Sequence, residues 1–392
     1  MDTAASLSTV AAQTRLRKIE TFAVPPRWLF VRIETEDGAV GWGEASLEGH
    51  TEATQAAFAE IRERFIGHDA DRIEDMWQVF YRLGFYRGGP VLMSALSGFD
   101  QALWDLKARR LGVPVWQLLG GRVRDRVQVY AWIGGDRPSD VVDAGKARLA
   151  QGFKAVKMNA SEDMAWLDSP KVIDGVCDRL TSVQALGLDV GLDFHGRVHK
   201  PMARQIAHAL EPLRPLFIEE PLLSEHPEAI AQFANMTSTP VALGERLYSR
   251  WDFKPFFERA CVDIIQPDLS HAGGISEVRR IAAMAEAYVA IAPHCPLGPL
   301  AMAACFQIGI STPNHVIQEM SLGIHYNTNG HDLLFYMKNP EVFDVKDGYV
   351  EALQGPGLGV EIDEDKVREM AKDCPPWRNP AWRGPDGYVR EW

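Results

Sequence analysis

The feature that most constrains the fold is a series of short apolar runs, each of which ends in a charged or polar residue. From the middle of the chain onward these runs end, at intervals of 23–26 residues, at Asp193, Glu219, Glu245, Asp268, His294 and Glu319. Each interval holds a strand-like run and a helix-like segment such as 277–287, which is the spacing of a βα unit. Two similar runs upstream, 126–132 and 154–159, raise the expected number of strands to eight. Eight consecutive βα units predict an α/β fold of the (β/α)8, or TIM, barrel type, with its chemistry at the C-terminal ends of the strands.

The part of the chain before the barrel lacks this alternation. The runs 29–35 and 39–44, joined by Glu36-Asp37-Gly38, predict a β-hairpin. Helices are predicted at 52–65, 73–83 and 91–111, the last with an apolar stripe at helical spacing. Strands followed by three helices predict a separate α+β domain that precedes the barrel.

After Glu319 the alternation stops. A short strand at 349–353, a helix at 364–372 and an extended tail at 377–392 are expected there. The predicted division of the chain is a disordered tail over 1–14, an α+β domain over 15–125, a catalytic barrel over 126–330 and a C-terminal segment over 331–392 that packs back on both.

Charge and composition restrict the partners. The chain carries 41 Lys and Arg against 53 Asp and Glu, a net charge of −12, which argues against a nucleic-acid partner because nucleic acids require a basic face. No apolar run approaches the length of a membrane span, so no membrane partner is expected. Five scattered cysteines without a CxxC pair indicate reduced thiols in a cytoplasmic enzyme. A homo-oligomer is also expected.

Three carboxylates predict a metal site. Asp193, Glu219 and Glu245 end the third, fourth and fifth strands, which are neighbours in a barrel, so their side chains should converge. Hard oxygen ligands with open positions suit Mg²⁺, and without a cation the three charges would repel one another. The alternative is that each carboxylate pairs with a nearby arginine: Arg197, Arg246 or Arg214.

Two histidines could move protons beside that metal. Asp268 and His294 end the sixth and seventh strands, and a carboxylate oriented on an imidazole raises its basicity and fixes its tautomer. His195 lies on the other side, at strand three, and Glu319 at strand eight could donate a hydrogen bond or orient the substrate. The alternative for His294 is a structural histidine in a Pro-His-Cys-Pro loop.

These residues together resemble the mandelate racemase subgroup of the enolase superfamily. The resemblance rests on the three carboxylates, the Asp268–His294 pair, Glu319 and the turn at 356–359, and it continues over the segments 25–28, 85–90, 134–138, 191–197, 266–274, 292–298, 323–327 and 377–380. It implies that the α+β domain is a capping domain completed by the C-terminal segment. It also implies a modified barrel and one Mg²⁺ per subunit that stabilises an enediolate. Within the subgroup, the chain resembles the galactonate-dehydrating enzymes.

One difference from mandelate racemase bears on the reaction. That enzyme has Lys-x-Lys on its second strand, where the second lysine is a base, and this chain has Lys157 followed by Asn159 at those places. The missing base argues for elimination rather than racemisation. The reaction so implied is dehydration of a sugar acid: Lys157 adds positive charge at the carboxylate, His294 takes the C2 proton and His195 protonates the departing 3-OH.

The expected substrate contacts come from the cap loops and the barrel mouth: Arg27, Trp28, His50, Asn159, Arg197 and His325. Three alternatives remain at this stage. The substrate could be gluconate or another epimer, the enzyme could be a racemase or epimerase of a 2-hydroxy acid, or the chain could be a catalytically silent structural or binding protein.

Overall fold

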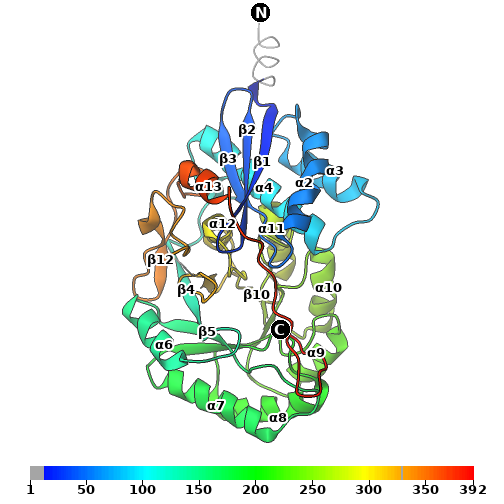
Figure 1. Ribbon diagram of the computed structural model, residues 1–392, viewed down its shortest axis with the longest axis vertical. Helices are drawn as coiled ribbons and strands as arrows, with labels where there is room; N and C mark the ends of the chain where they lie inside the picture. The colour runs from blue at the N-terminus through cyan, green and yellow to red at the C-terminus, as the bar shows by residue number, and fades with distance from the viewer. Residues whose placement is uncertain (1–12, 328–329) are drawn as a thin grey trace, which may run out of the picture.

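The computed structural model describes residues 13–327 and 330–392. The disordered tail predicted for 1–14 therefore lies almost entirely outside the described residues. Figure 1 shows a smaller domain at the top, built from the N-terminal strands and helices, above a larger domain of strands ringed by helices.

The smaller domain is a three-stranded antiparallel sheet packed on helices. Its elements are β1 (Leu16–Val24), β2 (Trp28–Thr35), β3 (Val40–Glu44), α2 (Thr51–Phe65), α3 (Ile73–Leu83) and α4 (Pro90–Leu111). The predicted hairpin and the three helices are confirmed within one residue at their ends. Strand β1 was not predicted, because its residues do not alternate between buried and exposed.

Close packing of β3 on α4 gives this domain a rigid base. A Cβ at Gly43 would lie 2.2 Å from the carbonyl oxygen of Gly98 on α4, so only glycine allows this approach. The main core of the domain is a separate apolar cluster that includes Leu29, Phe58 and Phe99.

The larger domain contains the eight expected strands in one curled parallel sheet. They are β4 (Arg126–Ile133), β5 (Ala155–Asn159), β6 (Asp189–Asp193), β7 (Ile218–Glu219), β8 (Val241–Leu243), β9 (Ile264–Ile265), β10 (Ala290–Ile291) and β11 (Gln318–Met320). Each strand pairs with the next in the chain up to β10, while β11 pairs with β4. A parallel bridge between Ile291 and His315 joins the two ends of this order, which closes the barrel.

Helices follow the strands as the βα spacing predicted. They are α6 (Val141–Ala150), α7 (Pro170–Gln184), α8 (Lys200–Leu210), α9 (Pro227–Ala234), α10 (Arg250–Arg259), α11 (Gly274–Ala285) and α12 (Pro299–Ser311), with α5 (Val115–Leu118) before the barrel. Because successive strands are parallel, the carboxyl ends of all eight meet at one mouth of the barrel.

The C-terminal segment contacts both domains. Strand β12 (Tyr349–Glu351) pairs antiparallel with the start of β4, and helix α13 (Glu364–Met370) packs against β1. From α13 the chain runs without regular structure from the smaller domain down across the barrel, as the red segment of Figure 1 shows. The domain boundaries drawn from the sequence stay predictions.

Buried carboxylates hold the smaller domain to the barrel. Glu44 of β3 accepts hydrogen bonds from the backbone N–H groups of Gly298 (2.8 Å) and Ala301 (3.0 Å) at the start of α12. Asp100 of α4 accepts from Ser276 on α11 in the same way. The loop that carries His294 immediately precedes α12, so these hydrogen bonds to Glu44 fix the point at which that loop enters the helix. None of the described helices is long and apolar enough to cross a membrane, while the expected homo-oligomer and cytoplasmic location stay predictions.

Candidate active site

A cavity of about 320 Å³ lies at the barrel mouth, beneath the loops of the smaller domain. Its volume falls in the range of small-molecule sites. Seven of the predicted site residues line it: Arg27, Lys157, Asp193, His195, Glu245, His294 and Glu319. They come from the cap and from the ends of β5, β6, β8, β10 and β11, so the fold brings together residues that are far apart in the chain.

A buried lysine lies at the centre of the acidic residues. Lys157 Nζ is 2.6 Å from Glu219 Oε1, 3.0 Å from Glu319 Oε1 and 3.3 Å from Asp193 Oδ2. Burial alone would lower the pKa of Lys157, but these carboxylates raise it well above its usual value. Lys157 therefore stays positively charged, although its side chain is 2% exposed.

The acidic cluster fits a divalent cation. Ligand atoms of Asp193, His195 and Glu245 all lie within 4.8 Å of one another. Asp193 Oδ2 is buried and lies 3.1 Å from His195 Nε2 and 3.3 Å from Lys157 Nζ. Clustered carboxylate oxygens, whose summed negative charge exceeds the single positive charge of Lys157, are the ligands that small hard cations prefer.

Glu219 lies differently from its two predicted co-ligands. It pairs in register with Asp193 across β6 and β7, as expected, but both its oxygens are engaged. Oε1 faces Lys157, and Oε2 accepts a 2.6 Å hydrogen bond from Gln266. Burial and the neighbouring Asp193 raise the pKa of Glu219 well above its usual value, and Lys157 offsets only part of this. Its place among the metal ligands stays a prediction.

The arginine alternative for these carboxylates finds little support in the geometry. Arg197 directs its guanidinium to the carbonyl oxygens of Asp136 (3.0 Å) and Ser161 (2.6 Å), and only Arg246 approaches one of the three, with Nε 3.6 Å from Glu245 Oε1.

His294 lies between two carboxylates. Its Nδ1 is 2.9 Å from Asp268 Oδ2, and its Nε2 is 3.0 Å from Glu245 Oε2. Burial lowers the pKa of His294, but Glu245, Glu319 and Asp268 raise it by more, so it lies well above its usual value. Because Asp268 only accepts hydrogen bonds when ionised, Nδ1 carries a proton and Nε2 is the nitrogen that faces the cavity.

His195 has the opposite partner at Nδ1. Nη2 of Arg197 lies 3.3 Å from His195 Nδ1, and a guanidinium can only donate, so Nδ1 accepts and Nε2 carries the proton. His195 Nε2 is 3.1 Å from Asp193 Oδ2. The residue is not an extension of β6 but lies in a turn with φ of +49°, held by a hydrogen bond from its N–H to Asp193 Oδ1 (2.9 Å). Such a left-handed backbone is uncommon at a non-glycine residue and turns the imidazole of His195 out of the β6 line toward Asp193.

Glu319 supports its neighbours. Its Oε1 contacts Lys157, and its Oε2 accepts a 3.0 Å hydrogen bond from the backbone N–H of Cys295, next to His294. Both contacts require Glu319 to act as an acceptor.

Five predicted substrate contacts do not line the cavity. Trp28 is fully buried against Phe30 and Tyr336, and His50 is exposed at the start of α2. His325 stacks on Trp132 outside the cavity, while Asn159 and Arg197 are buried behind it and donate to backbone carbonyls. In the cap, the side chain of Arg27 therefore reaches the cavity, whereas that of its sequence neighbour Trp28 does not.

Glu48, which also lines the cavity, lies in the cap loop 48–50 that was expected to read the substrate, whereas other lining residues were not predicted there: Asp136, Tyr248, His271, Tyr326, Asn379 and Trp392. His271 follows Asp268 by three residues beyond a strand end, which is a usable signal. Asp136 accepts a 2.5 Å hydrogen bond from Tyr326 and lies in a segment that the resemblance had marked. Asn379 and Trp392 reach the cavity only through the fold of the C-terminal tail, so no local pattern indicates them.

The comparisons with known proteins agree with this architecture. Residues 15–120 match the family model described as mandelate racemase / muconate lactonizing enzyme, N-terminal domain, and residues 140–366 match the enolase C-terminal domain-like model. A D-galactonate dehydratase from Variovorax paradoxus (strain S110) is 52% identical over 382 residues, which cover 96% of this chain and 100% of that protein.

Solved structures agree as well. An enolase from Agrobacterium radiobacter, crystallised with Na and L-malate, has a TM-score of 0.87 and 33% identity over 96% of this chain and 100% of its own. A mandelate racemase/muconate lactonizing enzyme-like protein from Roseovarius sp. TM1035 has a TM-score of 0.82 and 28% identity over 93% and 98%. The chain therefore belongs to the mandelate racemase subgroup of the enolase superfamily.

Proposed function

We propose that this protein is a Mg²⁺-dependent dehydratase that converts D-galactonate to 2-dehydro-3-deoxy-D-galactonate and water. The observation that carries the proposal is a pair of histidines in one cavity with opposite Nδ1 partners, Asp268 at His294 and Arg197 at His195. The 52% identity to the D-galactonate dehydratase of Variovorax paradoxus supports the choice of substrate.

The substrate carboxylate binds at the acidic cluster, beside Lys157. We assign Asp193, Glu219 and Glu245 as the residues that hold Mg²⁺. The cation would supply positive charge beside the substrate carboxylate and, by drawing on Glu245, would leave Nε2 of His294 free to accept a proton. Lys157 adds a second positive charge, held in place by three carboxylates. Gln266, through its bond to Glu219, orients that carboxylate.

His294 removes the proton from C2. Its Nδ1 proton is held by Asp268, so once Glu245 binds a cation the lone pair of Nε2 becomes available to the C2 proton, and Asp268 stabilises the imidazolium that forms. The electron pair left at C2 forms the C2–C3 double bond as the C3–O bond breaks, and the resulting enol becomes the 2-keto acid.

His195 protonates the departing hydroxyl. A histidine that protonates a hydroxyl must start as the imidazolium, so His195 donates from Nε2 in its charged form, which Asp193 Oδ2 at 3.1 Å stabilises; the 3-OH leaves as water and the ring is left neutral. This difference between the two histidines disfavours racemisation, which needs a base on each face of C2. Asn159, on β5 in the place of the second base, is an amide that donates to the backbone carbonyls of Gly135 and Asp136 and cannot accept a proton from C2.

A direct assay tests the proposal. Purified protein with D-galactonate and Mg²⁺ should form the 2-keto-3-deoxy acid, detected by NMR, and EDTA should abolish turnover until Mg²⁺ is restored. Gluconate, assayed in parallel, shows whether the enzyme distinguishes galactonate from an epimer. Formation of a C2 epimer without keto acid would instead identify a racemase, and no turnover of any sugar acid would support a catalytically silent protein.

A further inference from the structure

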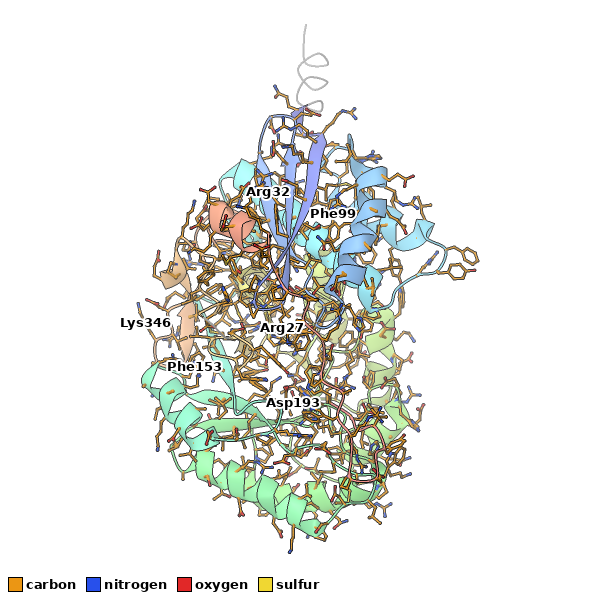
Figure 2. The ribbon with its side chains drawn as sticks, in the orientation of Figure 1. Arg27, Arg32, Phe99, Phe153, Asp193 and Lys346 are labelled. Atoms are coloured by element: carbon orange, nitrogen blue, oxygen red, sulfur yellow. The ribbon has the colours of Figure 1, made fainter. Side chains whose placement is uncertain are left out.

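The cap side of the cavity contains a buried arginine without a hydrogen-bond partner. Arg27 is 5% exposed, its guanidinium lies 3.8 Å above the ring of Tyr326 and 4.9 Å from that of Trp377, and it donates no hydrogen bond to any of the described residues. Figure 2 shows Arg27 between the cap sheet and Asp193, where the cap meets the barrel. A desolvated guanidinium that lines a cavity indicates a ligand with acceptor oxygens.

A carboxylate lies opposite this arginine. Glu48, from the loop after β3, has Oε1 3.8 Å from Arg27 Nη2, which is beyond hydrogen-bond range, and Oε2 3.4 Å from His271 Nε2. Burial would raise the pKa of Glu48, but the bond to His271 and the charge of Arg27 lower it to about 2. Glu48 is therefore ionised at neutral pH and presents acceptor oxygens beside a donor.

Arg27 and Glu48 line the same cavity as Lys157 and Asp193, so the far end of a substrate whose carboxylate binds at the strand ends can reach this pair. A terminal hydroxyl can accept from Arg27 and donate to Glu48 at the same time. A terminal carboxylate can only accept, so it would suit Arg27 but would be repelled by Glu48.

We propose that Arg27 and Glu48 select sugar acids that end in a hydroxyl and reject dicarboxylates, with Glu48 as the rejecting residue. This inference rests on the proposed function, and it adds a rule for the end of the substrate that does not react. Without Glu48, the unpaired Arg27 would favour the dicarboxylate, because a guanidinium binds a carboxylate through two hydrogen bonds.

Galactonate and galactarate provide the test, since they differ only at C6, which is a hydroxymethyl in one and a carboxylate in the other. The wild-type protein should have a kcat/KM for galactonate at least a hundredfold above that for galactarate. Glu48→Gln should raise the galactarate-to-galactonate ratio at least tenfold, and Glu48→Ala should change it in the same direction. Adding Arg27→Gln to Glu48→Gln should remove the gain.

Glu52→Gln is the matched control, because Glu52 lies on the same domain but outside the cavity, paired with the exposed Arg378. Its ratio should equal that of the wild type. If the wild type dehydrates galactonate but both Glu48 variants leave the ratio unchanged, the inference is wrong while the proposed function stands. If the wild type turns over neither acid, the proposed function itself fails.

Discussion

Two histidines at the barrel mouth differ in what faces their Nδ1 atoms. His294, after β10, has the carboxylate of Asp268 at 2.9 Å, whereas His195, after β6, has the guanidinium of Arg197 at 3.3 Å. An acceptor at Nδ1 leaves a lone pair on Nε2, and a donor at Nδ1 leaves a proton there. One neighbouring side chain in each case thus fixes which ring nitrogen carries the proton when the imidazole is neutral.

The two neighbours also differ in how they are held. Asp268 is fixed within its own strand-end loop by a 2.6 Å hydrogen bond from the N–H of Ser270. Arg197 is fixed by carbonyl oxygens of Asp136 and Ser161, which follow β4 and β5, and stacks over Trp382 of the C-terminal segment. The support of the base, His294, is therefore local, whereas the support of the acid, His195, depends on several distant segments of the chain.

Replacing each histidine in turn should have the largest effects on C2 exchange and on product formation. His294→Asn should abolish both C2 hydrogen exchange in D₂O and product formation, with a loss of at least about 10⁴-fold. His195→Asn should lose about 10²–10⁴-fold in product but keep exchange at C2, because the base remains. NMR of galactonate in D₂O measures both. Exchange that survives His294→Asn but not His195→Asn would reverse the two roles.

Asp268→Asn should place a hydrogen-bond donor at Nδ1 of His294, as Arg197 does at Nδ1 of His195. An amide can donate to His294 Nδ1, which would place the proton on Nε2 and remove the lone pair that the reaction needs. We expect a loss of about 10³–10⁴-fold in kcat, with C2 exchange lost in parallel. Activity close to that of the wild type would show that the His294 tautomer does not depend on Asp268.

Much of this comparison was open to prediction from the sequence. The regular spacing of apolar runs located the strand ends, and in a parallel barrel those ends must meet. Lys157, Asp193, Glu245, His294 and Glu319 could therefore be grouped from their positions in the chain alone. The Asp268–His294 pair followed from the same rule, because their strands are consecutive.

What could not be predicted depends on contacts between distant segments. The turn that gives His195 a positive φ, the reach of Arg197 to its Nδ1, and the arrival of Trp392 from the chain end have no local signature. Trp28 and His50 were expected to contact substrate because they lie in the cap loops expected to cover the barrel mouth. A one-residue step in an irregular loop turns a side chain away, so adjacency there carries little information.

The Mg²⁺ affinities of two variants should show whether His195 is a metal ligand. Donor atoms of His195, Asp193 and Glu245 lie within 4.8 Å of one another, whereas we assign Glu219 as the third ligand. Glu219→Gln should weaken Mg²⁺ binding at least tenfold by calorimetry, while His195→Asn should change it less than threefold. The reverse result would make His195 a ligand and remove it from the role of acid.

Arg197→Met should have a smaller effect, limited to proton donation by His195. His195 would keep its place but lose the donor that fixes its tautomer, so product formation should fall about tenfold while C2 exchange persists. Arg137→Met is the control, because Arg137 also stacks over Trp382, at 4.5 Å, but bonds to Asp163 rather than to His195. Equal losses in both variants would attribute the effect to packing on Trp382.

His315, before β11, extends the comparison to a buried histidine without a carboxylate partner. Burial and the nearby Arg124 lower its pKa to about 3, so the folded protein keeps it neutral, while the unfolded chain protonates it below about pH 6.5. Stability from this group is thus complete above pH 6.5 and is lost as the pH falls toward 3, with a slope of at most about 1.4 kcal/mol per pH unit. His315→Gln should flatten the pH dependence of the urea midpoint between pH 6.5 and 4, whereas replacing the exposed His226 by Gln should not. An unchanged slope in His315→Gln would mean that His315 is already protonated in the folded protein, and that burial without a carboxylate partner does not keep this histidine neutral.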